Sequence, residues 1–279
     1  MYSRTIGNII VNAYREYTPS SILAKTAREL YGTLLSVSVS TLESFAKCRF
    51  AHFAKYGLGL SEREEYGFEN TDLGTMSHDC LEEIGKSLSA QKLDFSTATA
   101  EILKAEVERA IDKITVGNRE NIINSDAKNK YYITELKRIM NRTVDTLGYQ
   151  LSKGKFTPAV YEQPFSRIYE FEDEELKGVK VNLKGRIDRI DLCEESEERE
   201  IVKIIDYKSS SRKFDPDALE AGVSLQLAIY MRSAIDTLKE MHPDKDVRPG
   251  AMFYYAIDDP FVADSADSEK LIREKLIPT

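Results

Sequence analysis

Two carboxylates and a lysine on neighbouring segments are the residues of this chain best suited to chemistry. Asp188 lies in the segment 184–191, and Asp206 and Lys208 close the segment 204–208. Both segments read as strands, and alternate side chains of a strand share a face, so Asp206 and Lys208 point the same way. Oxygen ligands suit Mg²⁺, and a bound metal beside an ammonium group can promote attack on a phosphodiester. The spacing therefore predicts a metal-dependent site for phosphodiester hydrolysis.

Each of these residues also has an ordinary structural interpretation. A strand that ends in Asp206 and Lys208 can simply direct two charges into solvent, and Asp188 can pair with Arg186 or Arg189. The expected strand pairing favours the metal, because like charges directly opposite each other destabilise a sheet unless a cation neutralises them. The alternation of apolar residues along the strand also changes face near Asp188, which indicates a β-bulge there. Bulges often redirect functional side chains.

His78 is a candidate metal ligand on a predicted helix that begins at Asp72. Its side chain lies away from the apolar stripe of that helix, on the side that carries Gly74 and Gly85. Glycines leave room for another element to approach closely. A lone histidine is more often a surface or structural residue, so that interpretation stays open.

Three further polar residues are candidates for the same site. Glu162 lies on a predicted strand, and Gln226 and Tyr230 lie one turn apart on a predicted helix, so they share a face. There they could hold a phosphate or orient Lys208. The alternatives are a strand acid without a role and a helix edge whose tyrosine reaches towards solvent.

The first half of the sequence reads as helical. A capping-box pattern at residues 40–43 predicts the start of one helix, which would continue through Phe45, Phe50 and Phe53. Apolar residues also follow the helical repeat in four other segments: 20–31, the helix from Asp72, 97–114 and 127–151, with a hinge at 115–124.

The pattern changes to that of strands near Phe156. We predict strands at 160–169, 179–192, 200–208 and 249–257, and a return to helical spacing at 215–241. The acidic link 194–200 is short, which implies an antiparallel hairpin. The last strand is a nearly continuous apolar run, typical of a strand buried on both faces, and the helix before it permits a crossover into the same sheet.

These elements predict an α/β (α+β) fold in which helices flank a mixed central sheet. The 279 residues are enough for one large domain or two modest ones. We expect one domain with three parts: a helical lead-in over residues 1–35, a helical part with His78 over 36–155, and a β-β-β-α-β core over 156–279.

Composition and charge narrow the class of protein. Contents of 42% hydrophobic and 31% charged residues predict a soluble, folded chain, and no apolar run approaches the ~20 residues of a membrane helix. The N-terminus lacks the apolar region of a signal peptide, so we expect a cytoplasmic protein. The net charge of -8 argues mildly against nucleic acid, but binding depends on a local basic patch. Basic residues do gather beside the acids: Lys184, Arg186, Arg189, Lys203, Lys208, Arg212 and Lys213.

Other chemistries lack support in the sequence. It contains no Walker loop, no dinucleotide-binding glycine motif, no HExxH and no CxxC. With 3 scattered histidines, a histidine-rich zinc site is not expected.

The candidate residues together resemble the RecB-family nuclease domain of the PD-(D/E)xK superfamily, which has a restriction-endonuclease-like core. The resemblance rests on five motifs in order: Gly-Thr-Met-Ser-His at 74–78, Glu162, Gly-Arg-Ile-Asp at 185–188, Asp-Tyr-Lys at 206–208 and Gln-Leu-Ala-Ile-Tyr at 226–230. A closer resemblance, carried by the segment 37–53 around Cys48, is to the AddB (RexB) family, the B subunits of bacterial helicase–nucleases. It covers roughly residues 28–260.

This resemblance implies a role for each candidate residue. It implies four ligands for one divalent metal, Mg²⁺ or Mn²⁺: His78, Asp188, Asp206 and the main-chain carbonyl of Tyr207. Glu162 would assist through water or a second metal. Lys208 would position the attacking water and stabilise charge on the phosphate, and Gln226 and Tyr230 would complete the site near the DNA backbone.

The implied activity is that of a Mg²⁺-dependent DNA exonuclease. It would cleave single strands delivered by an AddA-type helicase–nuclease subunit, during processing of double-strand breaks for recombinational repair. Two alternatives stay open: a catalytically inactive DNA-binding scaffold of the same fold, and a stand-alone single-strand exonuclease. The segment around Cys48 disfavours the second.

One feature of the AddB family is incomplete in this sequence. The family closes an iron–sulfur cluster with one cysteine before the nuclease core and three near the C-terminus. Cys48 matches the first, but no cysteine follows Cys193, and such a cluster needs four thiolates. We therefore expect a [4Fe-4S] cluster only in a longer protein of which this chain is a fragment, and we expect Cys80 and Cys193 to be core or strand residues.

Overall fold

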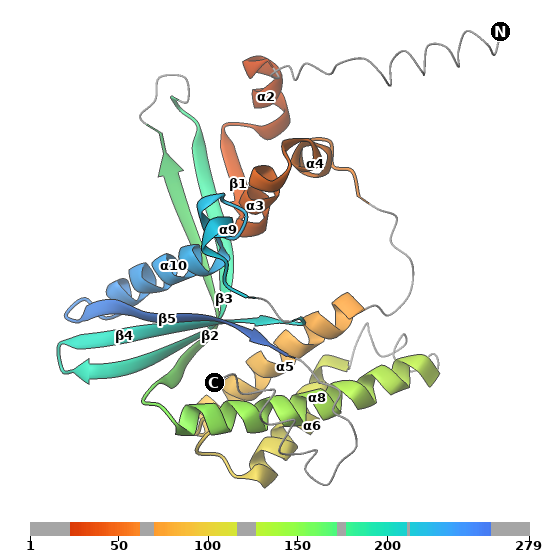
Figure 1. The fold of residues 1–279 in the computed structure, drawn as a ribbon, viewed down its shortest axis with the longest axis vertical. Coiled ribbons are helices and arrows are strands. Elements are labelled where there is room, and N and C mark those ends of the chain that lie inside the picture. The colour runs from red at the N-terminus through yellow and green to blue at the C-terminus, as the bar shows by residue number, and fades with distance from the viewer. Residues whose placement is uncertain (1–22, 62–69, 116–126, 172–176, 211–212, 258–279) are drawn as a thin grey trace.

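The computed structural model of the chain describes residues 23–61, 70–115, 127–171, 177–210 and 213–257 (Figure 1). Most of the predicted hinge at 115–124, the beginning of the predicted helix 20–31 and Arg212 lie outside these residues. Within the described part of the chain, no helix combines the length and apolar character needed to span a membrane.

A mixed sheet is the centre of the fold, as predicted. Its strands are β1 (Leu34–Ser38), β2 (Thr157–Glu170), β3 (Lys180–Ser196), β4 (Arg199–Lys208) and β5 (Asp246–Ala256). The predicted antiparallel hairpin is β3 with β4. The predicted crossover is also confirmed, because β5 runs parallel to β4 after an intervening helix.

The pairing of β3 leaves an opening in this sheet. One edge of β3 pairs antiparallel with β2 along its length. The other edge is shared, since β1 pairs in parallel with residues 180–184 and β4 pairs antiparallel with residues 189–196. On this edge, residues 185–188 of β3 therefore pair with neither β1 nor β4. An opening forms there between the ends of β1 and β4.

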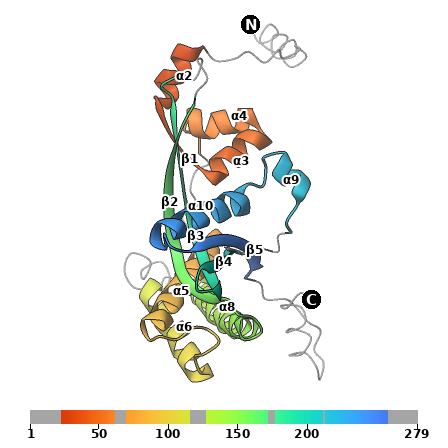
Figure 2. The same cartoon turned by 90° about the vertical axis from the view of Figure 1, so that its left-hand side faces the viewer.

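Helices cover both faces of the sheet. The α-helices of the described residues are α2 (Ala24–Tyr31), α3 (Val39–Lys47), α4 (Arg49–His52), α5 (Asn70–Ala90), α6 (Ala100–Thr115), α8 (Ala127–Ser152), α9 (Pro216–Glu220) and α10 (Gln226–Met241), and η1 (Phe53–Gly57) is a π-helical turn. Helices α3 and α10 lie to one side of the long β2–β3 ribbon, and α5, α6 and α8 gather at its lower end (Figure 2).

Two hydrophobic cores hold these layers together. On the α10 face, Leu227 and Ala234 pack with Ile187 and Ile204 of the sheet. On the other face, a larger core joins α5, α6 and α8 to Tyr161, Ile205 and Tyr207. Of the predicted apolar stripe of α5, Leu73 is partly buried and the other four residues are fully buried in this core: Met76, Cys80, Ile84 and Leu88. Neighbouring residues of β4 thus face different cores, which is why its sequence is apolar at nearly every position.

The predicted room beside Gly74 and Gly85 is confirmed. A Cβ atom at Gly85 would lie 2.3 Å from the ring of Tyr161 on β2. At Gly74 the nearest atoms belong to Ser209, at 3.6 Å. Helix α5 therefore approaches the sheet closely on the side that carries His78.

The N-terminal part departs from the prediction in two ways. Residues 34–38, expected to precede a helix, form strand β1, whose partner on β3 lies far away in the sequence and leaves no local signal. The next helix begins two residues earlier than the capping box at 40–43 indicated: Ser38 is the N-cap, and its hydroxyl accepts from the Thr41 N–H at 3.2 Å. It ends at Lys47, and α4 and η1 replace the single helix predicted through Phe53.

The C-terminal part also differs in detail. The predicted helix 215–241 is broken into α9 and α10. Strand β5 is not buried on both faces: it is the outermost strand on its side of the sheet, and Phe253 is 53% exposed. A long apolar run indicated burial, but helices cover this edge strand only in part.

Candidate metal centre

The opening in the sheet brings together carboxylates from two strands. Arg189 pairs with Ile205 at the end of the β3–β4 ladder, so Asp188 and Asp206 follow as the next opposed positions. Both side chains are buried, at 8% and 1% exposure. The expected proximity of the two acids therefore results from the hairpin register, and neither charge is directed into solvent.

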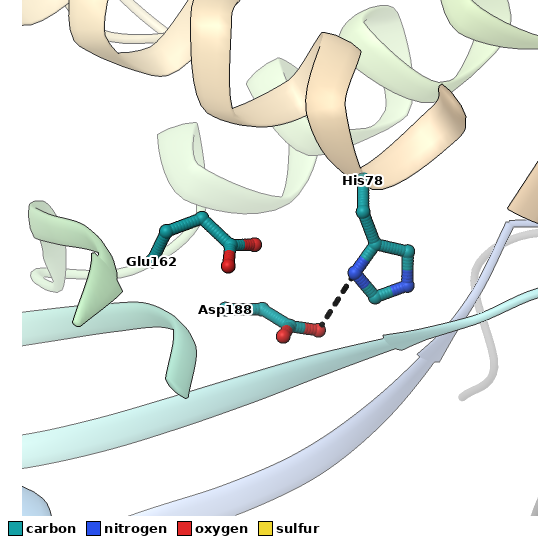
Figure 3. Close-up of side chains that lie close together, drawn as sticks. All are labelled: His78, Glu162 and Asp188. Atoms are coloured by element: carbon teal, nitrogen blue, oxygen red, sulfur yellow. Dashed lines mark ion pairs between the residues drawn. The ribbon is translucent and has the colours of Figure 1, made fainter. Parts of the chain in front are cut away.

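His78 and Glu162 reach Asp188 from two other elements. One potential ligand atom from each of the three residues lies within 4.8 Å of the others, and Figure 3 shows the three side chains directed towards a common point. Nδ1 of His78, on α5, lies 3.3 Å from Oδ2 of Asp188. Among the described residues, this is the group whose geometry could hold a metal ion. His78 is thus part of a cluster and not an isolated surface residue.

Tyr207 contributes to the centre through its main chain. Its N–H donates to Oδ2 of Asp188 at 2.7 Å, and its ring packs edge-on against the ring of His78, with centroids 5.8 Å apart. Because N–H and C=O of a strand residue project to the same edge, the carbonyl of Tyr207 also faces the opening. Its role as a main-chain metal ligand stays a prediction.

Two of the basic residues beside the acids have a structural role instead. Arg189, expected near DNA or paired with Asp188, is 1% exposed. Its guanidinium group donates two hydrogen bonds to Asp191, at 2.8 and 3.1 Å, and one to the hydroxyl of Tyr207 at 2.9 Å. Lys203 pairs with the same Asp191 at 2.8 Å. No local pattern in the sequence indicated this network, which holds the hydroxyl of Tyr207 in place.

Asp206 is held by the other candidate residues. Nε2 of Gln226 donates to its Oδ1 at 2.7 Å and to the hydroxyl of Tyr230 at 3.2 Å. The ammonium of Lys208 forms an ion pair with Oδ2, but that buried oxygen accepts no hydrogen bond of good geometry from the described residues. Gln226 and Tyr230 thus share a face as predicted, and in this structure Gln226 joins Tyr230 to Asp206.

Glu43 is a further residue of the site that was not predicted from the sequence. Its Oε1 accepts the N–H groups of Leu225 at 2.7 Å and Gln226 at 3.1 Å. A carboxylate from α3 thereby caps the N-terminus of α10, where backbone donors lack partners within the helix. Its position within a possible capping box was the available signal, but the partner lies in a distant part of the chain.

The irregularity predicted at Asp188 lies on the neighbouring strand. Tyr161 pairs with Arg189 and Gln163 with Ile187, so β3 contains no extra residue there. Instead, Glu162, opposite Asp188, has a φ of 51°, in the left-handed region that a glutamate rarely adopts. The carboxylate of Glu162 lies 3.7 Å from Nε of Arg186. The strained backbone is therefore on β2, at Glu162, and not on β3 at Asp188.

Burial raises the pKa of every carboxyl group in the centre. Desolvation raises the pKa of Asp188 to about 6. Desolvation and the neighbouring Asp188 charge raise the pKa of Asp206 to about 6 and that of Glu162 to about 7. Burial also lowers the pKa of His78, which favours the neutral imidazole with a free nitrogen. Crowded acids, a neutral histidine and an oxygen of Asp206 without a hydrogen bond fit a divalent cation with oxygen-rich ligands.

The cysteines lie apart from this centre. Cys48 is exposed at the junction of α3 and α4, where its sulfur accepts the N–H of Ala51 at 3.5 Å. Cys80 is buried in the core, and Cys193 is half-buried on β3. The expectation that Cys80 and Cys193 are core and strand residues is confirmed.

Comparison with known proteins identifies the family of the chain. The family model described as the PD-(D/E)XK nuclease superfamily matches residues 36–276. A relative from Lachnoclostridium phytofermentans, named as the B subunit of an ATP-dependent helicase/deoxyribonuclease, is 35% identical over 272 residues, which are 98% of this chain and 23% of the relative. Proteins of the same name from Alkaliphilus metalliredigens and Clostridium tetani are 36% and 31% identical over 89% and 88% of this chain. The chain spans less than a quarter of the length of these relatives, at 22–23%.

Proposed function

The chain belongs to the PD-(D/E)XK nuclease superfamily, and we propose that it is a Mg²⁺-dependent deoxyribonuclease domain that hydrolyses DNA phosphodiester bonds. The observation that carries the proposal is the convergence of His78, Glu162 and Asp188, from three elements, within 4.8 Å of one another. Asp206 follows on the strand beside Asp188. Buried ionisable side chains that converge on one point from distant parts of the chain are typical of a functional site.

Four groups are proposed to hold the metal: His78, Asp188, Asp206 and the carbonyl of Tyr207. They combine one nitrogen with oxygen ligands, which suits Mg²⁺ and also Mn²⁺. When bound, the cation would make water a stronger nucleophile and offset charge that develops on the phosphate. The hydrogen bond from Tyr207 leaves the second oxygen of Asp188 available as a ligand.

The remaining residues are proposed to orient Asp206 and the attacking water and to transfer protons. Gln226 fixes one oxygen of Asp206 by its 2.7 Å hydrogen bond, so the carboxylate keeps its orientation. Lys208, held beside Asp206, can position the attacking water and stabilise negative charge on the phosphate. Glu162, whose pKa is about 7, can accept a proton through water near neutral pH. Tyr230 supports Gln226 through its hydroxyl.

The relatives suggest the biological setting. Because they are named as helicase/deoxyribonuclease B subunits, we propose that the domain acts within such an enzyme. An AddA-type subunit would deliver single DNA strands, and the domain would degrade them as an exonuclease during double-strand break processing for recombinational repair. The setting is the cytoplasm of a bacterium. In the full-length protein Cys48 would be one ligand of a [4Fe-4S] cluster whose other ligands lie outside this chain.

Two rival functions are less well supported. An inactive scaffold would not need three carboxyl groups whose pKa values are raised by burial beside a neutral histidine. A stand-alone exonuclease would share the centre, but the helicase-subunit relatives match 88–98% of the chain.

Cleavage of labelled single-stranded DNA tests the proposal. The chain is incubated with Mg²⁺, Mn²⁺ or EDTA, beside the variants Asp206→Asn and Lys208→Ala. Asp236→Asn is the matched control, because the ion pairs of Asp236 are with Arg167 of β2 and Arg232 of α10. We expect metal-dependent cleavage by the unchanged chain and the control, and cleavage at the EDTA level by the other two. Undiminished cleavage by both variants would overturn the assignment, and failure of the chain to bind Mn²⁺ in calorimetry would favour the scaffold.

A further inference from the structure

A groove lies on the sheet next to the metal centre. It has a volume of about 700 Å³ and is lined by Ser38, Pro164, Phe165, Ser166, Lys184, Gly185 and Arg186. It crosses three strands, since Ser166 and Ser38 both pair with Lys184, from β2 and β1 respectively. Arg186, two residues from Asp188, connects it to the centre through its approach to Glu162 at 3.7 Å.

The cationic side chains of the groove face away from α10. Lys184 and Arg186 are exposed, whereas Leu183 and Ile187 beside them are buried in the core with α10. Alternate residues of a strand point to opposite faces, so both cations project from the face that α3 and α10 do not cover. Figure 2 shows these helices on one side of the β2–β3 ribbon only.

The charge of this groove is unbalanced. Lys184 makes no ion pair with the described residues, and the side chain of Arg186 remains 64% exposed despite its approach to Glu162. Among the described residues, no carboxylate lines the groove, although the chain has a net charge of -8. The two cations repeat about 7 Å apart along β3.

We propose that this groove binds the sugar–phosphate backbone of single-stranded DNA next to the bond that is cut. Lys184 and Arg186 each neutralise a phosphate. Phosphate contacts fix the position of a strand without reading its sequence, which suits an enzyme that degrades any strand it receives. The inference rests on the proposed function, and it adds the path by which substrate reaches the centre.

Binding of fluorescein-labelled oligothymidylate in EDTA, measured by anisotropy over a series of NaCl concentrations, tests this path. The variant is Lys184→Gln/Arg186→Gln. The matched control is Arg232→Gln/Lys239→Gln, which removes one exposed arginine and one exposed lysine from α10 on the opposite face. We expect the groove variant to bind more weakly, with a slope of log affinity against log salt that is shallower by about 0.7 for each phosphate that is no longer neutralised. The control should bind like the unchanged chain.

Unchanged affinity and slope in the groove variant would overturn the inference, and so would an equal loss in the control. Lys184→Gln alone serves as a second variant, because Lys184 pairs with no carboxylate among the described residues and its removal leaves Glu162 paired. Hydrolysis of bis(p-nitrophenyl) phosphate by the unchanged chain with Mn²⁺ reports on the metal centre alone. Its absence would count against the nuclease proposal, while the binding result judges the groove separately.

Discussion

The backbone N–H of Tyr207 donates a 2.7 Å hydrogen bond to Oδ2 of Asp188. This bond continues the β3–β4 pairing one step beyond the ladder, with a side chain in place of a main-chain carbonyl. The position of a candidate ligand therefore depends on the strand that carries Tyr207, and the hydroxyl of Tyr207 is in turn bound by the buried Arg189 at 2.9 Å.

Tyr207→Phe should lower stability more than it lowers cleavage. The substitution keeps the ring and the backbone donor but leaves one N–H of Arg189 without its acceptor, at a cost of about 1–3 kcal/mol. Urea denaturation measures the cost. Tyr149→Phe is the control, because Tyr149 is 47% exposed. Equal stability of the two variants would show that the hydrogen bond from Arg189 contributes nothing.

The three carboxyl groups of the centre should contribute less to the stability of the metal-free chain as the pH rises through the acidic range. Folding raises the pKa of Asp188 and Asp206 from 3.8 to about 6 and that of Glu162 from 4.5 to about 7. The folded state then binds these protons more tightly, so the stabilisation is present below the unfolded pKa values and is lost between about pH 4 and pH 7.

Mn²⁺ should consequently raise the Tm more at pH 8 than at pH 5, because at pH 8 all three carboxyl groups are ionised and repel one another without a cation. Differential scanning calorimetry at both pH values measures this. Asp188→Asn should raise the Tm of the metal-free chain at pH 8 and abolish most of the Mn²⁺ response. A Tm shift independent of pH would contradict the proposed metal ligands.

Glu43→Ala should weaken the start of α10 and, through Gln226, the orientation of Asp206. Loss of a helix cap costs about 1 kcal/mol, and the N–H groups of Leu225 and Gln226 lose their acceptor. We expect a lower kcat at temperatures where the variant is still folded. Glu43→Gln, which keeps an oxygen acceptor, should recover most of the activity. If both variants cleave DNA as fast as the unchanged chain, the cap does not position the centre.

Gly85→Ala should destabilise the chain, whereas Gly74→Ala on the same helix should not. A Cβ at Gly85 would lie 2.3 Å from the ring of Tyr161, but one at Gly74 only meets Ser209 at 3.6 Å. Overpacking costs about 1–3 kcal/mol, while alanine in place of glycine in a helix gains up to about 1 kcal/mol. Thermal unfolding compares the two. Equal Tm values would mean that α5 can move away from β2 without cost.

The sequence predicted those parts of the centre that follow from local rules. The strand alternation put Asp206 and Lys208 on one face, and the short hairpin put Asp188 opposite Asp206. The helical repeat separated His78 from the buried stripe of α5. The two glycines on its side then indicated which face would meet the sheet, and Gly85 does so.

The parts that were missed depend on partners far away in the chain. Strand β1 is recognised only through its pairing with β3. The cap supplied by Glu43 depends on α3 lying beside α10. Arg189 looked like a cation available to DNA because its sequence neighbours are candidates for the site, yet Asp191 and Tyr207 satisfy it inside the core. Charge counts alone could not distinguish it from Lys184 and Arg186.

The meeting of β1 and β4 along one edge of β3 has a consequence for how the chain folds. β4 joins β3 through a tight hairpin, but β1 must return from a distant part of the sequence to pair with residues 180–184. Such non-local pairings carry a large loop-closure entropy and slow folding. We expect the hairpin to form early and β1 to dock late, so the opening between them should become enclosed only in the last stage of folding.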